Sequence, residues 1–169
     1  MGTFTKVKSN MIKYLQSNEF DKREDNQTNK KSVNDLIEIN KKGFITIDSQ
    51  NGTTKRNIIE RAYVIGFMNY NKALEFKRNF LFSGFNCIIV VPVKDENIPT
   101  QYDIPLTVDK NKIVTHMSTA IPIKYLNFEM KNIKLNIKDN VIMVFCYDTI
   151  FGRNASNENG LFKAIIKYL

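Results

Sequence analysis

The 169-residue sequence contains no tryptophan, one histidine, two cysteines and no long apolar run. The single histidine, His116, excludes metal sites built on two histidines and leaves only a lone catalytic imidazole. Cys87 and Cys146 lie inside apolar segments, which indicates buried free thiols, although a bridge between neighbouring strands stays open. No stretch approaches the roughly 18 apolar residues of a membrane helix, and residues 1–20 lack a signal-peptide core. We therefore expect an intracellular protein with no membrane partner.

Arginine is scarce as well, with 5 arginines against 20 lysines in a chain of net charge +8. A basic balance favours polyanions such as DNA or RNA, although lysine-rich codon usage in an A/T-rich genome produces the same surface. Because arginine supplies the planar fork that reads base edges, its scarcity indicates diffuse, salt-sensitive attraction to a nucleic-acid backbone. The alternative is a solvated face that guards an edge strand. The candidate residues are Lys55, Arg56, Lys77, Arg78, Lys124, Lys131, Lys134 and Lys138.

The apolar periodicity predicts an α+β fold: a mixed β-sheet of about five or six strands, with helices mainly on one face. Its strongest element is a βαβ unit at residues 60–93, in which buried strands at 61–68 and 87–93 flank a helix. Asn71 is expected to cap that helix and Gly84 to end it. Further strands are predicted at 44–47, 112–120 and 141–147. Strict alternation predicts an outer hairpin strand at 131–138, which would point Lys134 and Lys138 outward.

The chain is expected to divide into an N-terminal part, 1–31, and a single α+β domain, 32–169. Residues 4–17 have helical spacing, and the polar stretch 18–31 is typical of a linker. The first helix is therefore expected to dock on a partner subunit or to swing free. Together with the Phe-rich helices, this arrangement predicts a homodimer. Ser32 and Ser156 are expected to cap the second and last helices.

Two neighbouring segments carry a resemblance: residues 43–52 read GFITIDSQNG and residues 60–67 read ERAYVIGF. They resemble an uncharacterised family of giant DNA viruses of amoebae and of actinobacteria. Its members carry Gly-Phe-(Leu/Ile)-Thr-x-(Asp/Asn)-Ser-Gln-Pro-Gly and then (Gln/Glu)-Arg-Ala-x-Val-x-Gly-Phe. Asn51 stands where that family usually has proline, which matters little because Asn-Gly is itself a turn dipeptide. The resemblance implies a fold unit and no activity.

Within this pattern, Asp48, Ser49 and Gln50 follow a predicted strand. The simplest interpretation is that they close a turn by bonding to local backbone groups. The functional interpretation is that they form, with Arg61, a ligand-binding site at the strand end. Arg61 itself is expected to reach solvent or to pair with Asp48 or Glu60.

No pattern in the chain marks catalysis. His116 is interpreted as an ordinary strand residue, because no local signature accompanies the candidate triad partners. Carboxylates that could meet around a divalent ion have no spacing that requires it; they are Asp48, Glu60, Asp103 and Asp148. The sequence therefore predicts no catalytic residue, no metal and no cofactor. It favours a non-enzymatic, basic interaction protein of a large DNA virus, with a nucleic-acid-associated or scaffold role. The alternative is a small-ligand-binding or hydrolytic domain with a polar site at residues 48–50.

Overall fold

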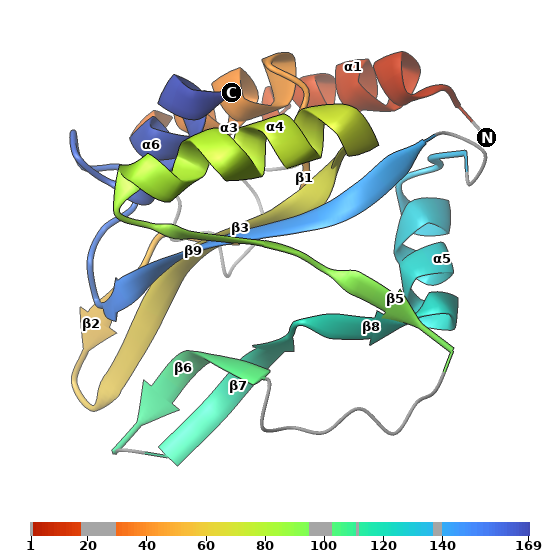
Figure 1. Cartoon of the computed structure of the whole chain (residues 1–169). Coiled ribbons are helices and arrows are strands. Elements are labelled where there is room, and N and C mark those ends of the chain that lie inside the picture. Colours follow the sequence, from red (N-terminus) through yellow and green to blue (C-terminus); the bar gives the residue numbers. More distant parts are fainter. Residues whose placement is uncertain (1, 18–29, 95–102, 111, 137–139) are drawn as a thin grey trace.

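The protein is an α+β domain, seen here in a computed structural model that describes residues 2–17, 30–94, 103–110, 112–136 and 140–169 (Figure 1). Across these residues the main sheet has seven strands, all paired antiparallel, and a second sheet pairs β5 with β8 in parallel. The path β4-β9-β3-β6-β7 runs through the main sheet, and β1 and β2 also pair with β3. The strands are β1 (Ile45–Gln50), β2 (Thr54–Lys55), β3 (Ile58–Asn69), β4 (Asn86–Ile89), β5 (Val91–Val93), β6 (Asp103–Asp109), β7 (Lys112–Ser118), β8 (Ala120–Pro122) and β9 (Val141–Phe151).

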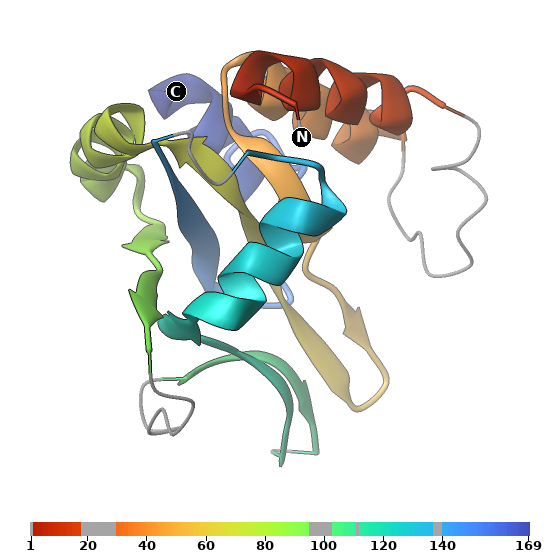
Figure 2. The same cartoon turned by 90° about the vertical axis from the view of Figure 1, so that its right-hand side faces the viewer.

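Helices lie mainly on one face of the sheet, as predicted. Figures 1 and 2 show α1, α3, α4 and α6 above the sheet and α5 on the opposite side. None of the described helices has the length and apolar character that a bilayer crossing needs. The helices are α1 (Phe4–Leu15), α3 (Lys30–Lys41), α4 (Tyr70–Phe80), α5 (Ile123–Asn132) and α6 (Leu161–Tyr168).

Strand β3 is the centre of the domain, which confirms the predicted buried strand at 61–68. It is apolar on both faces because both faces are covered. Val64 and Met68 pack into the cluster beneath the upper helices, whereas Ile65 and Phe67 pack into a second cluster on the α5 side. Two hydrophobic cores therefore share this one strand.

The predicted βαβ unit has its expected order, but its second strand is placed differently. Strands β3 and β4 run parallel in one sheet because β9 lies between them, antiparallel to both. The prediction of a continuous buried strand at 87–93 is wrong: β4 is an edge strand that ends at Ile89. Val91 and Pro92 belong to β5 and are exposed.

The predicted strand at 131–138 is also wrong over its described part. Residues up to Asn132 belong to α5, whose apolar side chains at 123, 126 and 130 recur at helical spacing. Lys134 follows in a turn with φ of 59°. The tight turn expected at residues 139–140 to close the hairpin begins at residue 139, which lies outside the described residues.

Three helices begin or pack differently from the prediction. Helix α3 begins at Lys30, so Ser32 lies inside it and hydrogen-bonds Ser156 across the helical layer. Helix α6 begins after Gly160, not at Ser156. Helix α4 is capped by Asn69, whose side chain accepts a 3.2 Å hydrogen bond from the N–H of Asn71.

Helix α1 packs on α3 of its own chain rather than swinging free. Its Val7 and Leu15 are buried, each in a different one of the two cores. The N–H of Gly2 donates a 2.8 Å hydrogen bond to the carbonyl of Lys134, which ties the start of the chain to the end of α5. Of the stretch 18–31 expected to act as a linker, residues 30 and 31 begin α3, and residues 18–29 lie outside the described residues.

Candidate functional site

A β-bulge in β1 decides where the polar residues of the GFITIDSQNG segment point. Thr46 pairs with Gly66 and Asp48 with Ile65, so Ile47 is the extra residue between them. Side chains alternate along a strand, and one inserted residue reverses which face each later residue occupies. Asp48 and Gln50 therefore share the face of Ile65, on the α5 side of the sheet, and Ser49 does not.

Close approach of the two strands at the bulge depends on Gly66. A Cβ atom built on Gly66 would stand 2.0 Å from the carbonyl oxygen of Ile45 on β1. The group that approaches Gly66 is the backbone of β1, at Ile45 and Thr46.

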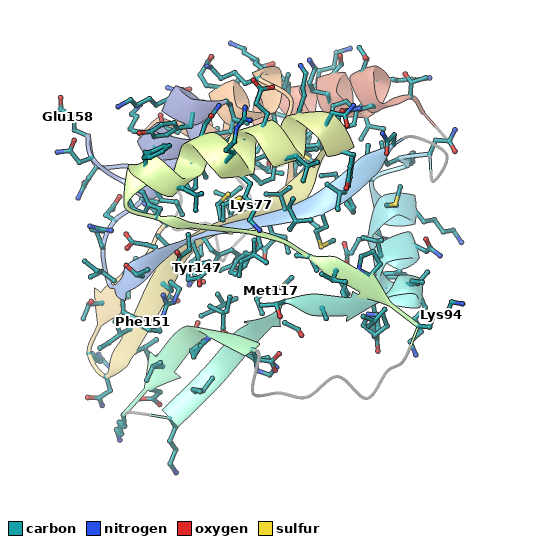
Figure 3. All side chains as sticks on the ribbon, in the orientation of Figure 1. Lys77, Lys94, Met117, Tyr147, Phe151 and Glu158 are labelled. Atoms are coloured by element: carbon teal, nitrogen blue, oxygen red, sulfur yellow. The ribbon has the colours of Figure 1, made fainter. Side chains whose placement is uncertain are left out.

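The α5 side of the sheet, where Asp48 and Gln50 project, contains a cavity. A cavity of about 480 Å³ lies between the main sheet, the β6–β7 hairpin, β8 and α5. Its volume is in the range of small-molecule sites. Met117, which lines the cavity, is labelled in Figure 3 between the β6–β7 hairpin and β9. The polar lining comprises Asp48, Gln50, Tyr63, Thr107, Thr115, His116 and Glu129, and the apolar lining comprises Ile47, Ile65, Leu106, Met117, Ile121, Met143 and Phe145.

Tyr63 holds Asp48 in place within this cavity. Its hydroxyl donates a 2.7 Å hydrogen bond to Oδ2 of Asp48, and Oδ1 accepts a 2.8 Å bond from the N–H of Ser49. Burial, followed by the charge and hydrogen bond of Asp48, raises the pKa of Tyr63 well above its ordinary value. Tyr63 therefore remains a hydrogen-bond donor throughout the physiological pH range.

His116 is placed beside an acid rather than standing alone. Its Nε2 lies 2.9 Å from Oδ2 of Asp103 on β6, and the His116 side chain is 52% exposed. An imidazole oriented by a carboxylate is the arrangement of a general base. Among the described residues, no hydroxyl or thiol hydrogen-bonds to this imidazole, so the pair lacks the adjacent nucleophile of a triad in this structure.

Arg61 does not line the cavity, and the expected partners of its guanidinium are wrong. Arg61 is buried, and its Nε donates to the carbonyl of Pro105 at 2.8 Å, while Nη1 donates to the carbonyl of Asp148 at 2.6 Å. These carbonyls belong to β6, which pairs with β3 at residues 58–60, and to β9, which pairs with β3 from Arg61 onward. The guanidinium lies 4.1 Å from the ring centroid of Phe151 on β9, so Arg61 links the strands β3, β6 and β9.

Two further acids of the predicted carboxylate group are used elsewhere. Asp148 is fully buried and accepts hydrogen bonds from Arg153, one of them 2.6 Å long, while Glu60 accepts one from Thr53. Within the described ranges, no group of three or more His, Cys, Asp or Glu side chains could hold a metal ion. Cys87 and Cys146 are free thiols opposite one another on β4 and β9, in the helix-side core and away from the cavity.

The candidate lysines fall into separate groups instead of one row. Lys77 and Arg78 end α4 in the helical layer, and Lys124 and Lys131 belong to α5 on the opposite side of the sheet (Figure 1). Lys134 follows α5, and Lys138 lies outside the described residues. Lys55 and Arg56 are at the β2–β3 turn, where they line a hollow of about 550 Å³ together with Lys110 from the β6–β7 turn. The N–H of Lys110 donates a 3.2 Å hydrogen bond to the carbonyl of Asn57, which holds the two turns together.

Residues 12–156 match the family described as "Domain of unknown function (DUF6919)". The chain belongs to this family. The matched region contains every described residue that lines the cavity, so the cavity is built within the DUF6919 region. No curated protein matches the sequence of the chain.

Proposed function

We propose that the protein binds a small organic ligand in the cavity beneath β1 and β3. The observation that carries the proposal is the bulge, which turns Asp48 and Gln50 into a hollow whose opposite wall presents His116 and Glu129. A recess with an apolar floor and a few converging polar groups is the usual form of a small-molecule site. Hydrolysis at this site is a narrower alternative, and the His116–Asp103 pair is the observation that favours it.

A fragment library screened by NMR on protein carrying ¹³C-methyl methionine tests this proposal. Met117 and Met143 line the cavity, and Met68 lies in the helix-side core as an internal control. Fragments that bind as proposed shift the methyl signals of Met117 and Met143 and leave Met68 unchanged. A screen in which no fragment moves Met117 or Met143, or in which every hit moves Met68 instead, contradicts the proposal.

A second candidate function is polyanion binding at the paired hairpin turns, favoured by the meeting of Lys55, Arg56 and Lys110 around one hollow. None of the three forms an ion pair with any described residue, so their charges face a partner or solvent. Phosphate contacts of this kind weaken steeply with salt. This second proposal also includes homodimerisation, an intracellular site of action in host cytoplasm or viral factory, and a source among giant DNA viruses.

Fluorescence anisotropy with DNA and RNA oligonucleotides at two salt concentrations tests the polyanion site. The double variant Lys55→Ala/Lys110→Ala is compared with Lys77→Ala/Lys131→Ala, which removes the same charge from other surfaces. The proposal predicts that only the first variant loses most of its affinity at low salt. Equal losses from both variants would indicate binding by net charge alone, and no binding even at low salt would remove this function.

A further inference from the structure

The cavity has the opposite charge character to the chain that contains it. The protein carries a net charge of +8, yet of the described residues that line the cavity none is Lys or Arg. Two carboxylates, Asp48 and Glu129, line it, and Asp103 stands behind His116 at its rim. An anionic ligand in the cavity would lie beside these carboxylates, and no Lys or Arg among the described lining residues would offset its charge. The repulsion between like charges therefore disfavours an anion.

The acid at the β1 wall is fixed in position rather than free to turn away. Both oxygens of Asp48 are already held, one by the Tyr63 hydroxyl at 2.7 Å and one by the backbone N–H of Ser49 at 2.8 Å. A carboxylate oxygen has more than one acceptor position, so Asp48 keeps acceptor capacity toward the cavity. The ring of Tyr63, which also lines the cavity, adds an aromatic face of the kind that attracts cations.

The rest of the lining selects for a ligand with an apolar part. Ile47, Ile65, Leu106 and Met117 line the same hollow, and the buried Phe145 lies beneath them. Divalent metals are a poor fit, because they need several converging ligands and no such group exists among the described residues. The chemistry that fits both parts of the lining is an organic cation carrying an apolar body.

We infer that the ligand of this cavity is an amphiphilic amine or quaternary ammonium compound, whose charge is received by Asp48 and Glu129. This inference rests on the proposed function and specifies its ligand class. Ligands of the phosphate or carboxylate class are excluded by the same acids. The carboxylates would form charge-assisted contacts with the ammonium group, which are stronger than neutral hydrogen bonds.

Three probes of one size and different charge test the ligand class: phenethylamine, 2-phenylethanol and phenylacetate. Each is titrated into the ¹³C-methionine protein, with Met117 and Met143 as cavity reporters and Met68 as the control. We expect phenethylamine to bind about tenfold more tightly than 2-phenylethanol, and phenylacetate not to bind. The preference for phenethylamine is expected to narrow as salt rises, because Asp48 is exposed to solvent and exposed charges are screened.

Variants that remove one carboxylate charge show which acids cause the preference for phenethylamine over 2-phenylethanol. Asp48→Asn removes the charge and keeps an acceptor for the Tyr63 hydroxyl. Glu129→Gln removes the charge of the acid on α5. Either substitution alone is expected to reduce the tenfold preference for phenethylamine over 2-phenylethanol to about threefold, because one carboxylate remains, while binding of 2-phenylethanol stays the same. Glu158→Gln, on the loop before α6 and far from the cavity in Figure 3, is the matched control and leaves the preference intact.

The outcomes separate the ligand class from the existence of the site. Equal binding of phenethylamine and 2-phenylethanol at Met117 and Met143 overturns the ligand class and leaves the cavity as a binding site. Preferential binding of phenylacetate overturns the class as well. Failure of all three probes to shift either cavity methyl at millimolar concentration overturns both this inference and the proposed function.

Discussion

The hydroxyl of Tyr63 on β3 donates a 2.7 Å hydrogen bond to the Asp48 carboxylate on β1. The two residues are not direct partners in the sheet: Tyr63 pairs with Gln50 and Asp48 with Ile65. Both side chains nevertheless share the cavity face, because the bulge at Ile47 places residues 48 and 50 on it. The hydrogen bond thus spans two positions of the β1–β3 ladder and fixes the acid that we propose receives the ligand.

Replacing Gly66 should break the register that creates this relationship. Gly66→Ala places a Cβ 2.0 Å from the Ile45 carbonyl, so β1 has to move away from β3. We expect the free energy of unfolding to fall by about 3 kcal/mol or more, at the upper end of overpacking effects. Gly2→Ala, whose added Cβ has no neighbour closer than 3.5 Å, is the control and should change stability by less than about 0.5 kcal/mol. Urea denaturation of both variants measures this; similar midpoints would contradict the register.

Arg61 is expected to matter for stability and not for ligand contact. Arg61→Met leaves the carbonyls of Pro105 on β6 and Asp148 on β9 without the donors that Arg61 supplies. The expected loss is about 2–4 kcal/mol, the cost of two unmet buried acceptors. Arg78→Met on the exposed side of α4 is the matched control, with a change within about 0.5 kcal/mol. Chemical denaturation decides the matter, and an Arg61 variant as stable as the Arg78 variant would show that this contact does not hold the sheet.

Stability should fall at alkaline pH in a manner that depends on Tyr63. Burial and Asp48 raise the pKa of the folded-state hydroxyl above its ordinary value of 10.0. Above about pH 10 the unfolded chain releases this proton while the folded state retains it, so this group lowers the unfolding free energy by about 1.4 kcal/mol per pH unit. Below that pH the group makes no contribution to the pH dependence.

The comparison with Tyr63→Phe isolates this effect from the titration of lysines. The variant loses the hydrogen bond at every pH, which lowers its whole curve, but its decline between pH 10 and 11 should be shallower than that of the wild type. Denaturation curves from pH 8 to 11 provide the test. Curves that stay parallel through pH 11 would mean that Tyr63 does not retain its proton on folding.

Self-association is a prediction of the sequence, and one exposed surface gives it a physical reason. Leu81 and Phe82 after α4 are 70% and 82% exposed, and large apolar side chains in this state favour contact with another surface. Light scattering after size exclusion at tens of micromolar should report a dimer, and Phe82→Ser should shift it toward monomer. A wild-type monomer at that concentration removes the dimer.

Local signals predicted the parts of the fold that depend on local sequence. The apolar run at 61–68 could only be a doubly covered strand, and Gly84 ends its segment with φ of 79° as predicted. The signals conflicted where residues 133 and 135 alternate like a strand while 123, 126 and 130 repeat like a helix. The helix is formed because Met130 packs into the second core beside Leu135.

The candidate site was predictable only in part. Asp48 and Gln50 were singled out by the resemblance, and both line the cavity, whereas Ser49 and Arg61 do not. A bulge is set by the pairing of two strands and leaves no local signature, so the alternation could not show which face Asp48 takes. The same holds for His116, because its partner Asp103 comes from a neighbouring strand whose register the sequence does not specify. Tyr63 and Glu129 were missed because each reaches the cavity only through tertiary packing.

The most direct measurement is a crystal structure of the protein soaked with phenethylamine. We expect the amine within hydrogen-bonding distance of the Asp48 or Glu129 carboxylate, with the phenyl ring against Ile65 and Met117. We also expect the bulge at Ile47 that brings Asp48 to this face. A regular β1 with Asp48 turned toward the helices, or a probe bound on another surface while the cavity stays free of it, would contradict the account.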